Sequence, residues 1–220
     1  LGKCMCYSIV AIALDLIWGY TGMLSLGHGI YFCLGGYAMA MYLRLRDNGG
    51  ALTDFMQTGG LTKLPFFWKP FLSFPLAVLL VILVPGTLAA VIGYFVFRSR
   101  IKGVYFSIIT QALTWAAYSL FIANSKYTGG NNGITDFTSV FGSTRGAANR
   151  GHLTAMFFVA LTALVLVYLL ASWLVNSKFG KLLIAIRDGE NRTFFSGYCV
   201  NQYKNSIYTL SAVLAGIGGA

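Results

Sequence analysis

Polar side chains that can hydrogen-bond a neutral solute recur at helical spacing inside an apolar stretch of the chain. They are Ser107, Thr110, Gln111, Thr114 and Tyr118. Their offsets of three, four, seven and eleven residues place them on one face of an α-helix. In lipid, such a face must turn towards other helices or a cavity, because hydrocarbon offers no hydrogen-bond partner. The pattern predicts either the lining of a route for an uncharged solute or a set of interhelical hydrogen bonds.

Two titratable side chains lie in the apolar N-terminal region. Asp15 has apolar neighbours on both sides, and an aspartate near the centre of a membrane helix costs roughly 2.5–3.5 kcal/mol. It marks either a transport role or a structural contact, such as a cap of the chain break that follows. His28, close to Ser25, is either a packed, hydrogen-bonded ring or a gating residue on a solute route. Zinc is disfavoured, because no second ligand stands at ligand spacing.

The run that holds His28 reads GYTGMLSLGHGIYFCLGG. Glycine costs about 1 kcal/mol in a helix interior relative to alanine, so this run predicts a break between two membrane segments. Irregular backbone at membrane depth persists only inside protein or beside a cavity. Broken helices that line a cavity recur in transporters.

The elements that must position these residues are membrane helices. Of the 220 residues, 57% are hydrophobic and 10% charged, and the mean hydropathy is +0.70; soluble domains carry about 25% charged residues. We expect an all-α, polytopic helical membrane protein with kinked and broken helices. The expected passes are 4–20, 25–43, 71–97, 103–123, 151–175 and 204–220. They would form a single transmembrane domain over residues 1–220. We expect this sequence to be a fragment of a longer protein, with helices missing from it at both ends.

Prolines and small residues are expected to shape the helix bundle. Pro75 and Pro85 fall in one pass, and each is expected to kink it. Small residues four apart predict close approach of helix backbones. They are Gly86 with Ala90, Ala89 with Gly93, and the series Ala212, Gly216, Ala220.

Basic residues set the expected orientation, since they collect in cytoplasmic loops. One such loop holds Arg98, Arg100 and Lys102, and another holds Lys178, Lys181, Arg187 and Arg192. Loops 44–70 and 124–150 then face outward, although they also carry basic residues, Arg145 among them. The net charge of +10 therefore reflects membrane topology, and no nucleic-acid motif accompanies it.

The second outward loop contains a glycine-rich run over 128–136, which ends at Asp136. Its central residues are Gly129, Gly130, Asn131 and Asn132. The run lacks the Gly-Lys-Ser/Thr end of a phosphate-binding loop. We expect either a structured turn or a lid at the mouth of the solute route.

Segment 177–190 is amphipathic. Phe179, Leu182, Leu183 and Ile186 share one helical face, while Lys178, Lys181 and Asp188 lie largely opposite. Such a helix can lie on the membrane surface or dock in a partner protein. The mixed charge of Arg187, Asp188 and Glu190 favours the protein partner.

No constellation for catalysis is present. Two distant histidines and six acids offer no triad, metal cluster or carboxylate pair, and no nucleotide-binding motif occurs. We therefore expect a protein that is not an enzyme, with no metal or cofactor in this chain.

Four blocks of the sequence resemble a known family. They read ALDLIWGYTGMLSLGHGIYFCLGGYAM, FRSRIKGVYFSIITQALT, GGNNGITDF and SKFGKLLIAIRDGENRTFFSGY. They resemble the permease subunits of ABC importers for branched-chain amino acids, and more closely the urea-transport branch, on SIITQALT and GGNNGITDF. The resemblance covers nearly the whole chain.

The resemblance implies a subunit of the bacterial inner membrane that works with partners. They are a second permease, two cytoplasmic ATPases that use the ATP, and a solute-binding protein outside. It also implies a coupling segment that rests on an ATPase, with Ile184, Ala185, Arg187, Asp188, Glu190 and Gly197. Asn191 and Arg192 replace two alanines of the wider importer motif.

Three functions remain open at this point. The favoured one is import of urea or a small amide, with the solute crossing near Ser25, His28, Thr110 and Gln111; a branched-chain amino acid is the alternative substrate. The second is a passive channel or an ion-coupled carrier, with Asp15 as the proton-carrying group. A membrane enzyme or a purely structural bundle is the least supported.

Overall fold

The computed structural model describes residues 1–99, 101, 103–135, 139–140, 143–144 and 150–220. Its elements are α1 (Gly2–Thr21), α2 (His28–Asp47), α3 (Asp54–Thr58), η1 (Phe66–Leu72), α4 (Phe74–Arg98), α5 (Val104–Ala123), α6 (Ser125–Thr128), η2 (Gly130–Asn132), β1 (Ser139–Val140), β2 (Ser143–Thr144), α7 (Arg150–Asn176), α8 (Lys178–Phe195) and α9 (Val200–Gly219). The expected loop residues Arg100, Lys102, Asp136 and Arg145 lie outside the described residues.

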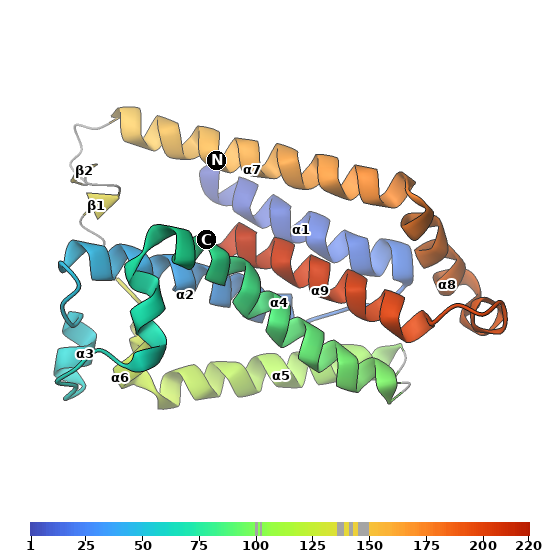
Figure 1. Ribbon diagram of the computed structural model, residues 1–220, viewed down its shortest axis with the longest axis horizontal. Coiled ribbons are helices and arrows are strands. Elements are labelled where there is room, and N and C mark those ends of the chain that lie inside the picture. The colour runs from blue at the N-terminus through green and yellow to red at the C-terminus, as the bar shows by residue number, and fades with distance from the viewer. Residues whose placement is uncertain (100, 102, 136–138, 141–142, 145–149) are drawn as a thin grey trace.

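The long helices run alongside one another, and the short elements gather at the end that holds α3 (Figure 1). Helix α8 lies at one end, next to the close of α7 and the start of α9; we call this the α8 end. Helices α3 and α6 lie at the opposite end, the α3 end. The helical fold class is confirmed, with one difference: β1 and β2 form a two-residue antiparallel pair.

Helix α9 occupies the centre of the bundle, in contact with α1, α2 and α4. Among the residues that the structure describes, four helices are long and apolar enough to cross a membrane: α1, α4, α5 and the part of α7 from Thr154 to Asn176. Helices α2 and α9 have 20 residues each but are less apolar. A helix enclosed by other helices needs less apolar surface than one that faces lipid, because its polar groups find protein partners.

Glycines bring three backbones into direct contact at this centre. A Cβ added to Gly35 of α2 would lie 2.0 Å from the carbonyl oxygen of Gly216 in α9. A Cβ on Gly216 would in turn lie 2.6 Å from Cγ of Pro85 in α4. The predicted close approach of small residues is therefore confirmed at Gly216.

The two prolines of α4 behave differently from the expectation. Pro75 lies in the first turn of the helix, where proline loses no hydrogen bond, so the predicted kink there is wrong. The preceding residues form η1, and the helix begins at Phe74 rather than at 71. Pro85 lies inside α4, and the helix continues through it.

The predicted break between the first two passes is confirmed. Helix α1 ends at Thr21, and Gly22 adopts φ 70°, a left-handed conformation that glycine reaches without steric cost. Its N–H donates to the carbonyl oxygen of Trp18 at 3.0 Å. The chain re-enters a helix at His28, so residues 22–27 form the break.

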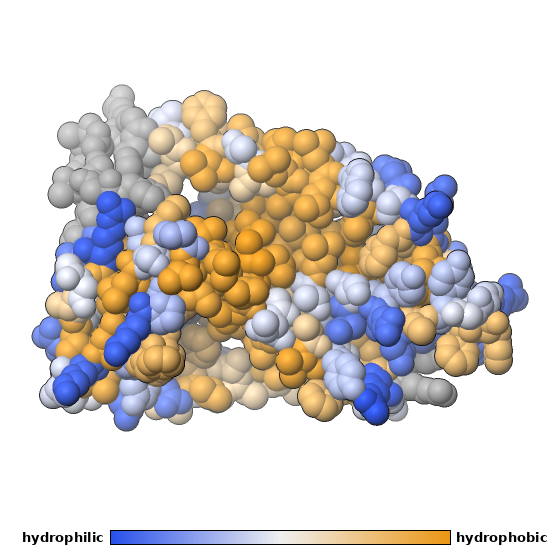
Figure 2. Space-filling view, in the orientation of Figure 1, coloured by the Kyte–Doolittle hydropathy of each residue, from blue (hydrophilic) through white to orange (hydrophobic). Residues whose placement is uncertain are grey.

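The surface carries a broad apolar band. Figure 2 shows hydrophobic residues across the middle of one face and hydrophilic residues towards both ends of the molecule. On α7, Tyr168, Leu169 and Trp173 are exposed on this chain. A surface of this kind is suited to lipid or to neighbouring membrane helices.

Candidate functional site

A pocket of about 420 Å³ lies between α2 and α5 at the α3 end, and η2 contributes to its wall. Helix α2 supplies Gly29, Ile30, Cys33, Leu34 and Tyr37. Helix α5 supplies Thr114, Ala117, Tyr118, Phe121 and Ile122. The loop adds Gly130, Asn131, Asn132 and Gly133. We call this the α2–α5 pocket.

Two contacts shape the pocket. The rings of Tyr37 and Phe121 meet edge to face across it, with centroids 4.9 Å apart. The loop is tied to α5 through Thr128, whose hydroxyl donates to the carbonyl oxygen of Phe121 at 2.7 Å and accepts from the N–H of Gly130 at 3.3 Å. The predicted glycine-rich run is thus an ordered turn that also lines a cavity.

The chemistry of the lining is apolar with a few uncharged polar groups. Ile30, Leu34, Phe121 and Ile122 supply large apolar side chains. Hydroxyls and amides come from Tyr37, Thr114, Tyr118, Asn131 and Asn132. None of the lining residues carries a formal charge at neutral pH. Pockets of this size and character hold single small ligands.

The predicted polar stripe of α5 separates into two faces. Ser107 and Thr110 are buried, and Thr114 lines the α2–α5 pocket. Gln111 is exposed on the surface of this chain and not on the interior face where the stripe placed it, and its role on a solute route stays a prediction. Successive residues of a helix are 100° apart, and the buried face of α5 is centred on Phe106 and Thr110. Gln111 and Tyr118 therefore lie at or beyond its edge.

Ser107 and Thr110 hold the break of residues 22–27. The hydroxyl of Ser107 donates to the carbonyl oxygen of Leu24 at 2.6 Å. The N–H of Leu26 donates to the hydroxyl of Thr110 at 3.1 Å. These bonds satisfy backbone groups that the break leaves without a helical partner.

His28 lies at the centre of a buried hydrogen-bond network and is 2% exposed. Its Nδ1 lies 3.0 Å from the hydroxyl of Ser25, and its Nε2 lies 2.8 Å from the hydroxyl of Ser211 in α9. The Ser211 hydroxyl donates to the carbonyl oxygen of Ala13 in α1, so Nε2 must be the donor to Ser211. The ring thus joins α1, α2 and α9. This matches the first alternative given for His28, a packed, hydrogen-bonded ring.

Asp15 lies apart from the other expected route residues. It is exposed on this chain, and it lines a cavity of about 310 Å³ between α1 and α7. Tyr20, Tyr168, Ser172 and Asn176 also line that cavity. A Cβ on Gly19 would lie 2.7 Å from Asp15 Oδ1, so the carboxylate lies against the last turn of α1.

Helix α8 has the predicted amphipathic character. Leu183 and Ile186 are buried, while Lys178, Lys181 and Asp188 are exposed. The hydroxyl of Ser177 caps its first turn by accepting from the N–H groups of Phe179 and Gly180. The helix extends beyond the expected 190 to Phe195, with a kink at Gly189.

Both sides of this kink are anchored to the bundle. Arg187 donates through Nη1 to the carbonyl oxygen of Gly19 in α1 at 2.7 Å. Beyond the kink, Glu190 pairs with Lys204 of α9 at 2.8 Å, and Lys204 is only 7% exposed. Two charges of the expected coupling segment therefore bind within the chain itself. Ile184 is half-buried, Ala185 is exposed, and Gly197 turns the chain towards α9 with φ 89°.

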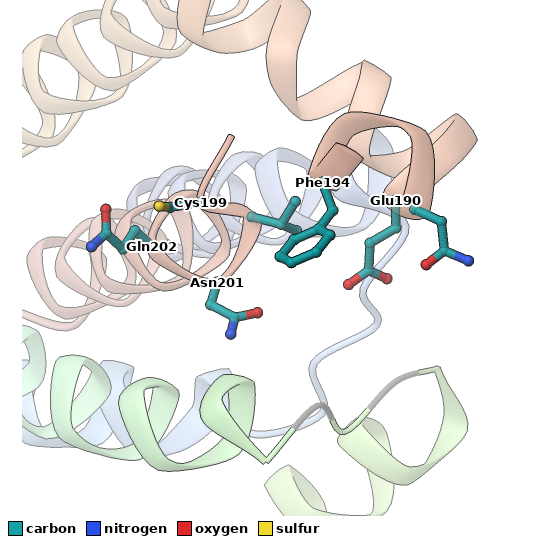
Figure 3. Close-up of a pocket in the computed structure, with 7 residues that line it drawn as sticks. Glu190, Phe194, Cys199, Asn201 and Gln202 are labelled. Carbon is teal, nitrogen blue, oxygen red and sulfur yellow. The ribbon is translucent and has the colours of Figure 1, made fainter. Parts of the chain in front are cut away.

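The end of α8 and the start of α9 enclose a third cavity, of about 340 Å³. Figure 3 shows that Glu190 and Phe194 come from α8 and that Asn201 and Gln202 come from α9. The neighbouring Phe195 is 86% exposed. Exposed aromatic rings, such as those of Phe194 and Phe195 at the end of α8, are enriched at protein contacts.

Over all 220 residues, the chain matches the family model described as the permease component of a branched-chain amino acid transport system. The chain belongs to this permease family. Curated relatives agree: the high-affinity branched-chain amino acid transport system permease proteins LivM of Escherichia coli and Salmonella typhimurium are 24% and 25% identical over 98% of this chain. A probable LivM protein of Methanocaldococcus jannaschii is 25% identical over 97% of it, and over 63% of the relative.

The chain spans about half the length of the first two relatives, 49% in each case. No solved structure matches it. The family is described as a transport permease component, and the described residues include several helices long and apolar enough to cross a membrane. Within the described part of the chain, no three His, Cys, Asp or Glu side chains gather where they could hold a metal ion.

Several residues of the site carried no signal in the sequence. Ser211 lies in an apolar pass, and its bond to His28 spans 183 positions. Cys33 and Tyr37 read as ordinary apolar residues of α2, although the period of 3.6 places them one turn apart on the face that contains Gly29.

Proposed function

We propose that this chain forms the solute route of an ATP-driven importer for branched-chain amino acids. The observation that supports the proposal most is the α2–α5 pocket, an uncharged, mostly apolar cavity of amino-acid size. The route would run from the α3 end, through this pocket and past the break, to the α8 end, which the basic residues of α8 favour as cytoplasmic.

The pocket favours an aliphatic amino acid over urea. Burying an aliphatic side chain against Ile30, Leu34 and Phe121 gains about 25 cal/mol per Å² of apolar surface. Urea has no aliphatic surface to bury against these side chains. The names of the relatives point the same way.

The proposed partners follow from the family. They are a second permease, two ATPases and a solute-binding protein outside, all set in or on a bacterial inner membrane. The coupling segment of residues 184–197 would contact an ATPase through the exposed tip that includes Phe194 and Phe195. The ion-coupled carrier loses support, because Asp15 lines a different cavity from the α2–α5 pocket.

The thiol of Cys33 provides a direct test, since it lines the pocket and is exposed. In the assembled importer with Cys33 as the single cysteine, we expect saturating leucine to slow its alkylation by N-ethylmaleimide, because the solute covers the thiol. Urea at the same concentration should have no effect.

A permease that retains only Cys4 is the control, because Cys4 is exposed on α1 and lies outside the pocket lining. Its labelling should not respond to leucine. Protection of Cys33 by urea alone would favour urea as the transported solute. Protection by neither solute would show that the pocket is not part of the solute route.

A further inference from the structure

The contact between Arg187 and the end of α1 joins two parts of the chain that are 168 positions apart. Arg187 lies on α8, two residues before the kink at Gly189. Its Nη1 donates to the carbonyl oxygen of Gly19 at 2.7 Å, and its Nε donates to Asp188 at 3.0 Å. Its side chain also packs on the break, since a Cβ on Gly22 would lie 3.1 Å from Arg187 Cγ.

The carbonyl that Arg187 binds belongs to the last turn of α1. The final carbonyls of a helix have no partner within the helix, and they form the negative end of its dipole. The N–H of Gly22 donates to the carbonyl oxygen of Trp18. The guanidinium of Arg187 donates a charge-assisted hydrogen bond to the carbonyl oxygen of Gly19. A side chain of α8 thus acts as part of the C-terminal cap of α1.

The cap lies at the start of a continuous path to the α2–α5 pocket. After Gly22 the break is bound by Ser107 and Thr110 of α5, as described above. It ends at His28, which is bound to Ser211 of α9. The next residues, Gly29 and Ile30, line the pocket. A displacement of α8 therefore changes the support of the same short segment that ends at the pocket wall.

We propose that Arg187 is a positioning residue that transmits movement of α8 to residues 22–27, and so to the pocket, through its bond to Gly19. The proposal rests on the proposed function, because the movement of α8 would come from the docked ATPase. It assigns Arg187 a partner inside the permease, where the resemblance alone placed it on the ATPase contact.

The test uses the complete importer in proteoliposomes with Arg187→Gln, which removes the charge and the reach to Gly19. We expect leucine transported per ATP hydrolysed to fall about tenfold, within the range of typical coupling free energies, while the ATPases still copurify. Arg187→Lys should reduce the leucine transported per ATP hydrolysed by less, because an ammonium can also bind a carbonyl. Arg98→Gln is the matched control, as Arg98 is exposed at the C-terminal end of α4 and bonds to Tyr94.

A second readout separates transmission from docking. In the wild-type importer, trapping the ATP-bound state should change the alkylation rate of Cys33, and Arg187→Gln should abolish this change. A normal transport ratio with a normal Cys33 response would overturn the proposal. Loss of ATPase copurification would also overturn it, in favour of a docking role. A wild-type importer that fails to transport leucine would refute the proposed function instead.

Discussion

His28 illustrates how a single buried polar side chain can hold three helices together. Its ring connects Ser25 beside the break to Ser211, which in turn bonds to the backbone of α1. Edge-to-face contacts with Tyr31 and Tyr208 enclose the ring, and the hydroxyls of these tyrosines lie 2.7 Å apart. The sequence alone indicates a polar residue at membrane depth, but the partner on α9 emerges only from the packed fold.

Ser211→Ala should lower the apparent melting temperature of the purified permease. The change leaves the Nε2 donor of His28 without its acceptor, at a cost of about 1–3 kcal/mol for a buried group. Ser206→Ala is the matched control, because Ser206 is exposed on the same helix and bonds only locally, to the carbonyl oxygen of Gln202. Equal melting temperatures for the two variants would show that the network adds no stability.

Helices were the most predictable level of the structure, because each long apolar segment indicates its own pass. All six expected passes correspond to helices, with ends displaced by a few residues. The face that each helix buries was harder to predict. Gln111 belongs to the polar stripe by spacing, yet α5 turns Phe106 and Thr110 inward and leaves Gln111 outside. The rotation of a helix depends on its neighbours, which a single-helix pattern does not contain.

Gly35→Ala should destabilise the bundle, whereas Gly29→Ala should not. Both glycines lie in α2, but a Cβ on Gly35 would meet the backbone of Gly216, and a Cβ on Gly29 meets open space. Overpacking of this kind costs about 1–3 kcal/mol, more than the ~1 kcal/mol that alanine gains over glycine in a helix. Thermal unfolding in detergent measures both; a Gly35→Ala protein at least as stable as wild type would contradict the close packing of α2 and α9.

For the whole molecule, family membership and the structure together explain why function could be predicted more coarsely than fold. The transport class follows from apolar passes, polar groups at membrane depth and the four resembling blocks. The substrate does not, because the α2–α5 pocket that we propose for it is built jointly by α2, α5 and η2, which are separated in the sequence. The apolar lining of that pocket and the names of the relatives favour a branched-chain amino acid over the urea that the sequence blocks indicate.

Uptake by the assembled importer tests this account most directly. The full-length permease, its second permease, both ATPases and the binding protein are reconstituted in liposomes, and labelled leucine is followed with ATP on the ATPase side. We predict uptake that requires ATP hydrolysis, that isoleucine and valine inhibit, and that an equal concentration of urea leaves unchanged. Uptake of urea in place of leucine, or leucine uptake that follows a pH gradient without the ATPases, would contradict it.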